Sequence, residues 1–237
     1  QTKLVDLKFG KQASMVQADT ELISTDYVAA FETTFVSNTT LSNCIFRDDS
    51  RFLSSAWPFI VVVENHFSNN SYQDSALVQF GGLKLPAAVN MSPVNSSKAI
   101  LGLQPGHSFQ IILARNNFTN EIVFSDIYIN IEEFCTTNSL ILFQNNTLDN
   151  ISTLLTPGLT FVLKFERVSS VLIDHNNFTN FLGSLYAMRV GEMKHTKVFV
   201  ASNNRIANLH NAAFFFASYV FIHDATFSNN LFENSEI

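Results

Sequence analysis

Short apolar runs recur along the chain, and polar residues separate each run from the next. The runs hold four or five residues rich in Val, Ile, Leu and Phe, and they span residues 59–63, 109–113, 140–143, 170–173, 197–200 and 219–222. Runs this short, with so many β-branched and aromatic residues, are typical of β-strands and too short for helices. The pattern therefore predicts short β-strands at regular intervals and no long amphipathic helix.

A polar motif comes after each run and reads Asn, any residue, then Phe, Leu or Ile, any residue, and Asn again. Six copies begin at Asn65, Asn116, Asn146, Asn176, Asn204 and Asn230, and a weaker copy, Thr39–Asn43, comes before them. The last Asn of successive copies recurs every 26–30 residues, except for one interval of 51 residues between Asn69 and Asn120. Repetition at such a period indicates a solenoid, in which each repeat forms one coil.

A strand, an Asn bend, an inward apolar residue, a second Asn bend and the next strand describe one coil of a parallel β-helix. Asn suits the bends because it tolerates left-handed backbone angles. We predict an all-β, single-stranded parallel β-helix with about eight coils of roughly 26–30 residues, stacked about 4.8 Å apart. Equivalent side chains then form structural ladders, which we expect to comprise Asn43, Phe67, Asn69, Phe118, Asn120, Leu148, Asn150, Phe178, Asn180, Ile206, Asn208, Phe232 and Asn234.

These strand-plus-motif units, which cover residues 36–237, resemble the right-handed parallel β-helix repeats of the pectin-lyase-like superfamily. The resemblance implies a right-handed coil. It leaves the function open, because that superfamily contains lyases, glycosidases, adhesins and structural stalks. We expect a non-catalytic member.

The repeat suggests one main domain over residues 36–237, preceded by N-terminal coils or a docking segment at residues 1–35. Within the 51-residue interval, residues 72–108 are expected to form one extra coil with a surface loop near 81–98. The last motif lies close to Ile237. We therefore expect the solenoid ends to expose strand edges that self-associate.

Eight sequons for N-linked glycosylation indicate the compartment. Their acceptors are Asn38, Asn69, Asn90, Asn95, Asn117, Asn145, Asn150 and Asn177. Most fall in motif bends, where a solenoid exposes side chains, so we expect N-linked glycans and an extracellular or cell-surface location. Asn117 and Asn177 share one motif position, and their glycans would project about 10 Å apart.

Charge, hydropathy and cysteine spacing argue against nucleic acid binding, a membrane span and a disulfide. A net charge of −6 with only 14 Lys and Arg argues against nucleic acid. No run of about 18 apolar residues is present, so no membrane span is expected. Cys44 and Cys135 are expected to lie more than three coils apart, too far for a disulfide, and we predict two unpaired thiols.

Candidate catalytic residues are few, and we predict no catalytic residue, no metal site and no cofactor. Fragments of a polygalacturonase-type pattern occur at residues 48–49, 106–108 and 205–207, incomplete and out of order. A calcium-dependent lyase would need clustered carboxylates with a nearby base. The candidates are Glu132, Glu133 and Asp174, with Arg115, Arg167 or Arg189. Two further pairs, Asp174-His175 and His223-Asp224, are expected at similar strand ends, where they would stack as a polar ladder.

The leading hypothesis is a secreted, N-glycosylated structural or adhesive β-solenoid, in one version a fibril or surface-layer subunit that assembles end to end. One alternative is a polysaccharide lyase or glycosidase of the pectin-lyase-like fold. Another is a non-catalytic glycan- or protein-binding module, although the single Trp and five Tyr supply few sugar-stacking residues.

Overall fold

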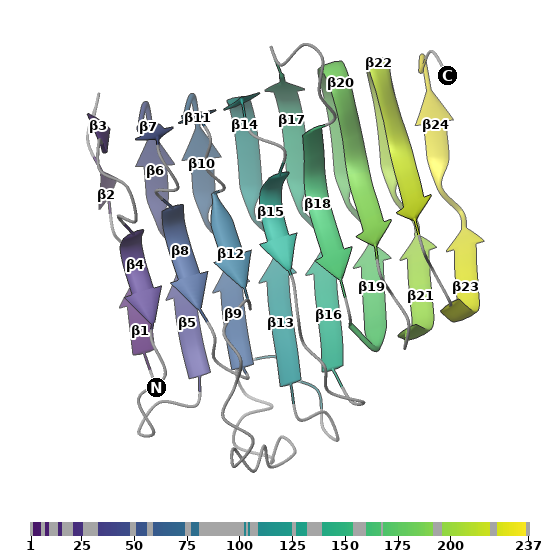
Figure 1. The fold of residues 1–237 in the computed structure, drawn as a ribbon, viewed down its shortest axis with the longest axis horizontal. Coiled ribbons are helices and arrows are strands. Elements are labelled where there is room, and N and C mark those ends of the chain that lie inside the picture. Colours follow the sequence, from purple (N-terminus) through teal and green to yellow (C-terminus); the bar gives the residue numbers. More distant parts are fainter. Residues whose placement is uncertain are drawn as a thin grey trace.

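The computed structural model describes residues 2–5, 8–9, 14–15, 21–25, 33–47, 51–55, 59–73, 77–80, 102, 104, 109–124, 127–131, 139–153, 160–166, 168–191, 196–218 and 222–235. All regular elements in these ranges are β-strands, and all of their pairings are parallel. The predicted parallel β-helix is therefore confirmed (Figure 1).

Eight strands form the first sheet, and they lie in chain order across it (Figure 1). They are β1 (Thr2–Val5), β5 (Thr33–Ser37), β9 (Phe59–Val63), β13 (Phe109–Ala114), β16 (Ser139–Gln144), β19 (Ser170–Asp174), β21 (Thr196–Ser202) and β23 (Ile222–Ser228). Each of these strands pairs with the equivalent strand one repeat further along the chain, which is the pairing that a stack of coils requires.

Sixteen strands form the second sheet. They are β2 (Lys8–Phe9), β3 (Ser14–Met15), β4 (Glu21–Thr25), β6 (Thr40–Ser42), β7 (Ile45–Arg47), β8 (Arg51–Ser55), β10 (His66–Ser68), β11 (Ser71–Gln73), β12 (Val78–Phe80), β14 (Asn117–Phe124), β15 (Ile127–Ile131), β17 (Thr147–Ser152), β18 (Thr160–Glu166), β20 (Asn177–Gly191), β22 (Arg205–Ser218) and β24 (Leu231–Glu233). The sheet covers two faces of the solenoid, because the long strand β20 pairs with β17 through its first half and with β18 through its second.

The long strand β20 changes its register with β22 between Leu182 and Leu185, at a β-bulge. Gly183 lies in this bulge with a φ of 103°. A Cβ atom there would stand 2.6 Å from the carbonyl oxygen of Thr153 on the neighbouring coil. The close backbone approach and the positive φ both require glycine at this position.

The strands before Phe35 continue the same two sheets. β1 pairs with β5, β2 with β6, β3 with β7 and β4 with β8, all in parallel. The described strands of residues 1–35 are therefore stacked on the repeats that follow them.

The 51-residue interval contains a single coil, and the predicted extra coil at residues 72–108 is wrong. Val62 pairs directly with Leu113, and Phe67 pairs directly with Phe118. β12, which the sequence suggested as part of an extra coil, completes the coil of β9 and β10 by pairing with β8 and β15. The additional residues are inserted between β12 and β13, where an insertion leaves strand pairing undisturbed. The predicted loop at 81–98 lies outside the described residues.

The end of this insertion lies against the outer face of the first sheet. The backbone amide of Gln104 donates a 2.7 Å hydrogen bond to the Oε1 of Gln110 on β13, and the Nε2 of Gln110 donates to the Gln104 carbonyl. Beneath it, outward-facing side chains form a second apolar cluster that includes Val61, Ile112 and Leu142. The central part of this face is therefore covered by the chain itself.

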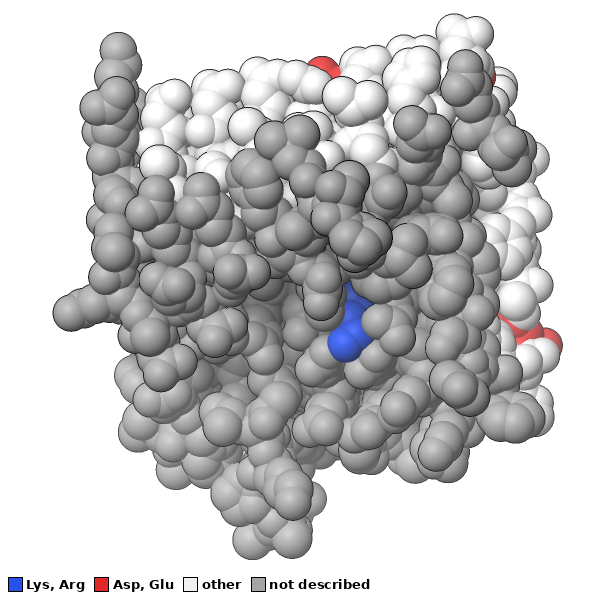
Figure 2. Space-filling model, turned by 45° about the horizontal axis from the view of Figure 1, so that its top comes forward, with Lys and Arg blue, Asp and Glu red and all other residues white. Residues whose placement is uncertain are grey.

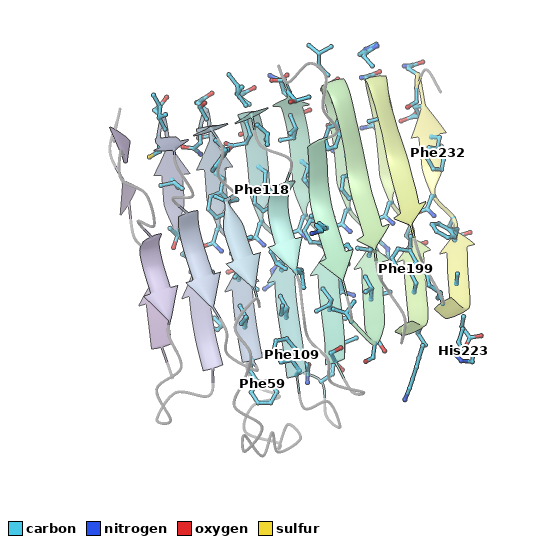
Figure 3. All side chains as sticks on the ribbon, in the orientation of Figure 1. Phe59, Phe109, Phe118, Phe199, His223 and Phe232 are labelled. Atoms are coloured by element: carbon cyan, nitrogen blue, oxygen red, sulfur yellow. The ribbon has the colours of Figure 1, made fainter. Side chains whose placement is uncertain are left out.

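The main core contains an apolar column formed by the central residue of each motif. Its members stack one per coil and are 0–1% exposed: Leu41, Phe67, Phe118, Leu148, Phe178 and Ile206. The rings of Phe67 and Phe118 are stacked with their centroids 5.0 Å apart. Phe232 continues the column on the last described coil, where it is 52% exposed (Figure 3).

Candidate functional site: the motif face and its asparagine ladders

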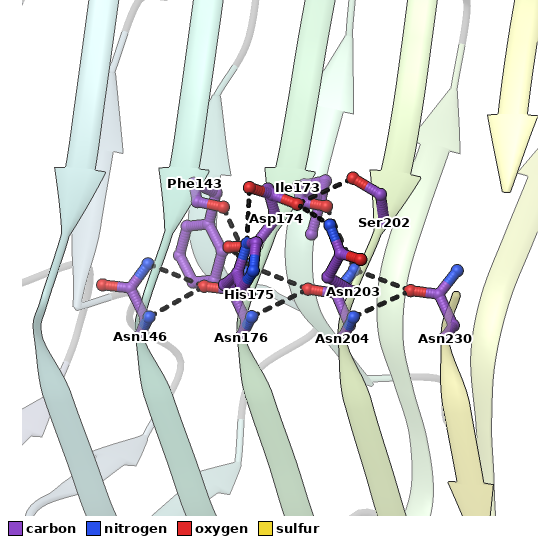
Figure 4. Close-up of polar contacts among 10 residues, drawn as sticks. All are labelled: Phe143, Asn146, Ile173, Asp174, His175, Asn176, Ser202, Asn203, Asn204 and Asn230. Atoms are coloured by element: carbon purple, nitrogen blue, oxygen red, sulfur yellow. Dashed lines mark hydrogen bonds and ion pairs between the residues drawn. The ribbon is translucent and has the colours of Figure 1, made fainter. Parts of the chain in front are cut away.

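The first Asn of each motif points into the solenoid and forms a continuous polar ladder, which we call the inner Asn ladder. Its members are Asn65, Asn116, Asn146, Asn176, Asn204 and Asn230. From Asn116 onward, the Oδ1 of each Asn accepts hydrogen bonds of 2.9–3.1 Å from both the backbone N–H and the Nδ2 of the Asn one coil earlier (Figure 4). The Oδ1 of Asn65, the first member, accepts from the backbone N–H of Thr39 at 2.9 Å. Each Nδ2 also donates to a carbonyl of the first sheet, as Asn176 does to Phe143 at 2.8 Å.

These contacts provide hydrogen-bond partners for the backbone N–H groups at the bend and for the Asn side-chain amides beside it. Asn65 to Asn204 are 1–2% exposed, so their polar atoms have no access to solvent. Buried amides and backbone N–H groups are costly unless they are hydrogen-bonded. The inner Asn ladder therefore fixes the distance and register between coils at the first bend.

This role was not predicted, because the sequence pattern indicates a bend at the first Asn of each motif. The left-handed residue is instead the one before it, which we call the first corner: Asn38, Glu64, Arg115, Asn145, His175, Asn203 and Asn229, with φ values of 51–59°. The signal that marks the ladder is the repetition of Asn at one position, while the residue at the first corner varies.

The last Asn of each motif lies at a bend, as the sequence pattern predicts. At this second corner Asn43, Asn69, Asn120, Asn150, Asn180, Asn208 and Asn234 have φ values of 46–57°. Some of their side chains contact one another along the surface: Asn150 Nδ2 donates to Asn120 Oδ1 at 2.7 Å, and Asn208 Nδ2 donates to Asn180 Oδ1 at 2.8 Å. This outer row donates toward the N-terminus, opposite to the inner Asn ladder.

A shorter inward row begins after the second corner. Cys44 N donates to Asn70 Oδ1 at 2.9 Å, and Asn70 Nδ2 donates to Glu121 Oε1 at 3.1 Å. Glu121 is fully buried, and its carboxylate oxygen takes the place that the next Asn oxygen has in the inner Asn ladder. Burial raises the pKa of the Cys44 thiol, and the nearby charge of Glu121 raises it further.

Cys44 is a free, buried cysteine, and Cys135 lies outside the described residues. The predicted separation of the two cysteines by more than three coils therefore stays a prediction. Cys44, Asn70 and Glu121 stand on three consecutive coils.

The six sequons that the structure describes occupy one face, which we call the motif face. It consists of the outer side of β6, β10, β14, β17 and the first residues of β20, with the two corners beside them. Asn38 and Asn145 lie at the first corner and Asn69 and Asn150 at the second, all four exposed. Two more are half-buried within strands, Asn117 on β14 and Asn177 on β20. Asn90 and Asn95 lie outside the described residues.

Asp174 lies at the end of β19 in a small polar cluster. Its Oδ1 accepts hydrogen bonds from Ser202 Oγ at 2.7 Å and Asn203 Nδ2 at 2.9 Å, and its Oδ2 lies 2.7 Å from His175 Nδ1 (Figure 4). Burial raises the pKa of Asp174, but these hydrogen bonds and the charge of His175 outweigh burial and hold the pKa below its ordinary value.

The second pair, His223-Asp224, does not stack on this cluster, so the predicted His-Asp ladder is wrong. Asp174 is aligned with Ser202 and then Ser228, whereas Asp224 is aligned with Val198. The reason is that Asp174 ends its strand and His223 lies near the start of β23.

We expect Ser202→Ala to raise the pKa of Asp174 toward its ordinary value, because the carboxylate loses a 2.7 Å hydrogen bond. A carboxyl group with a lowered folded-state pKa stabilises the fold above its unfolded pKa, and this stabilisation is lost as pH falls through the folded pKa. The parent should therefore lose stability below about pH 4, and Asp174→Asn should flatten this dependence.

An NMR titration of the Asp174 carboxyl carbon measures the pKa, and thermal unfolding at several acidic pH values measures the stability. Ser228→Ala is the matched control, because Ser228 occupies the same column one coil further on. An unchanged pKa in Ser202→Ala would show that this hydrogen bond does not determine the ionisation of Asp174.

The remaining catalytic candidates are not brought together among the described residues. Arg115 pairs with Glu64 at 2.9 Å, and Arg205 pairs with Glu233 at 2.7 Å. The described residues contain no group of three or more His, Cys, Asp or Glu suited to a metal ion. Residues 48–49, 106–108, Glu132, Glu133 and Arg167 lie outside the described ranges, as does the side chain of Arg189. On the face of the molecule that Figure 2 shows, the described residues are mostly uncharged, with isolated acidic and basic groups.

Among the described residues, no helix is long and apolar enough to cross a membrane. No protein-family model, curated protein or solved structure matches the chain.

Proposed function

We propose that this protein is an extracellular, N-glycosylated β-solenoid with a structural or adhesive role. The observation that carries the proposal is the position of the sequons: all six that the structure describes lie on the motif face, and four of them lie at exposed corners. A glycan attached at such a corner projects into solvent without entering the core.

The interior supports a mechanical role. A continuous apolar column and the inner Asn ladder run from coil to coil, and both are buried except for their members on the last described coil. In a solenoid, stability is the sum of such nearest-neighbour contacts, so the ladders make a stiff rod. We further propose the right-handed winding of the pectin-lyase-like superfamily, with this chain as a non-catalytic member.

End-to-end association into fibrils or a surface layer is the specific version of this proposal. Phe227, Leu231 and Phe232 on the last described coil are 51–53% exposed. Exposed apolar side chains beside an unpaired strand edge favour pairing with another coil. The alternatives are a polysaccharide lyase or glycosidase and a non-catalytic glycan- or protein-binding module, and no observation among the described residues favours either of them over this proposal.

Secretion from eukaryotic cells tests the proposal. We expect the protein in the medium, and we expect its intact mass to fall by several N-linked glycans after enzymatic deglycosylation. Negative-stain electron microscopy of the same sample should show rods or filaments. Protein that carries no glycan would contradict the proposed location, and monodisperse short particles at high concentration would contradict the fibril version alone.

A further inference from the structure

The six described sequons fall into two structural classes, although all obey the same sequence rule. The corner sequons are Asn38, Asn69, Asn145 and Asn150, whose left-handed backbone turns the side chain outward. The strand sequons are Asn117 and Asn177, whose side chains stand within a column on the motif face. Glycan transfer to Asn modifies the Nδ2 atom, so the surroundings of that atom distinguish the two classes.

The corner sequons leave their Nδ2 atoms accessible. Among the described residues, the amides of Asn38, Asn69 and Asn145 make no side-chain hydrogen bond, and all three residues are exposed. Asn150 Nδ2 donates to Asn120 Oδ1 at 2.7 Å. A glycosylated amide keeps one N–H, so this contact is compatible with a glycan on the exposed Asn150.

Asn117, in contrast, is packed against neighbouring side chains. It is half-buried, and its Nδ2 lies 3.1 Å from His66 Nδ1 on the neighbouring coil. Its Oδ1 is enclosed without a hydrogen-bond partner. His66 and Thr147 flank it in the column at about 4.8 Å on either side. A sugar on this Nδ2 would have to fit beside these flanking side chains, and it would displace them.

Asn177 is constrained through its oxygen and its sequon threonine. Its Oδ1 accepts a 3.2 Å hydrogen bond from Arg205 Nη1, and Thr147 and Arg205 flank it in the column. Thr179 is only 6% exposed, and its Oγ1 donates to Asp149 Oδ1 at 2.7 Å. The side chain of Asn177 is therefore held by its neighbours in the column.

We propose that the folded protein carries glycans at the corner sequons Asn38, Asn69, Asn145 and Asn150 and not at the strand sequons Asn117 and Asn177. The glycans then form two rows, one along each corner, and the column that contains Asn117, Thr147 and Asn177 carries no glycan between them. This inference rests on the proposed function, because it requires passage through a glycosylating compartment. It replaces the earlier expectation that glycans at Asn117 and Asn177 project side by side.

The chemistry is the ordinary transfer from a lipid-linked oligosaccharide pyrophosphate. A bond forms between Nδ2 and the anomeric carbon, the bond from that carbon to the pyrophosphate oxygen breaks, and Nδ2 loses one proton to a base of the transferase. Chains modified at Asn117 would have to rearrange the motif face in order to fold. We therefore expect them to be absent from the secreted protein.

Site-resolved mass spectrometry tests the inference on the secreted parent chain. Enzymatic deglycosylation in H₂¹⁸O converts each glycosylated Asn into ¹⁸O-labelled Asp, and the label identifies the site. We expect label at the four corner sequons and none at the strand sequons. Label at Asn117 and Asn177 equal to that at the corners would overturn this inference and leave the proposed function standing. Absence of label at every site would instead contradict the proposed function.

Two matched variants test the inference independently. Thr119→Val removes the sequon of Asn117, and Thr147→Val removes that of Asn145, while both acceptor residues stay in place. Both threonines are half-buried strand residues, and valine preserves their shape and β-branching. We expect Thr147→Val to lower the intact mass by one glycan and Thr119→Val to leave the glycan mass unchanged. Loss of one glycan in Thr119→Val would overturn the inference.

Discussion

Asn176→Leu is expected to lower the free energy of unfolding by roughly 3–5 kcal/mol, although leucine has a similar size. The backbone N–H and Nδ2 of Asn146 lose their only ladder acceptor, and the carbonyl of Phe143 loses its donor. Asn146 and Asn176 are 1% exposed, so water cannot replace these partners. A buried polar group left without a partner costs about 1–3 kcal/mol.

Chemical unfolding measures the loss, and hydrogen exchange of β16 and β19 shows where it acts. In a solenoid each coil is stabilised mainly by its neighbours, so we expect exchange to increase most in these two strands. Asn208→Gly is the control: it removes a surface contact between corner Asn side chains, and glycine accepts the left-handed bend. We expect a loss below about 1 kcal/mol in the control. Equal losses in the two variants would show that the inner Asn ladder contributes no more than a surface contact.

The fold was predictable from the sequence because the repeat fixes both chemistry and spacing. Phe67, Phe118 and Leu148 recur at the centre of the motif, and the structure places them in register in one buried column. Their apolar character is enough to indicate the side of the coil on which they lie. The last Asn of each motif was equally accessible to prediction, since a left-handed bend favours Asn.

The inner Asn ladder was harder to predict, because Asn is suited to a bend and to a buried hydrogen-bond row alike. What distinguishes the two roles is the backbone angle of the preceding residue. Glu64, Arg115 and His175 adopt the left-handed conformation there, and none of them carries the Gly or Asn signature of such a bend. Only the three-dimensional course of the chain shows that Asn65, Asn116 and Asn176 face inward.

The insertion and the Asp174 cluster show a second limit. A 51-residue interval is compatible with either a degenerate coil or one coil with an insertion, and sequence spacing alone does not separate these cases. Only strand pairing between Val62 and Leu113 decides between them. Similarly, Asp174 and His223 both lie beside apolar strand residues, but the sequence does not reveal that one ends its strand and the other begins it.

The two sequon classes follow from the same distinction between corner and strand. Asn117 and Asn145 satisfy one sequence rule, yet one is half-buried beside His66 and the other is exposed at a left-handed bend. The period of the repeat places both residues in the motif. Their accessibility differs because Asn145 precedes an inner Asn, at the corner, whereas Asn117 follows one, in the strand.

Phe118→Ala is expected to cost about 3–5 kcal/mol, because it removes a fully buried ring from the middle of the apolar column. Phe118 is 1% exposed and stacks on Phe67 at 5.0 Å, and its partner on the next coil is Leu148. These neighbours are held by their own strands and cannot close the cavity. Phe118→Leu should cost less than about 1.5 kcal/mol, since the same column already accepts leucine at Leu41 and Leu148.

Phe232→Ala is the positional control for this prediction, because Phe232 belongs to the same column but is 52% exposed. A side chain that remains half in water gains less from burial, so we expect a loss of about 1 kcal/mol. Chemical unfolding of the three variants compares the same column at its centre and at its last described coil. If Phe118→Ala is no more destabilising than Phe232→Ala, the apolar column cannot be the main source of cohesion between coils, and the inner Asn ladder must supply it.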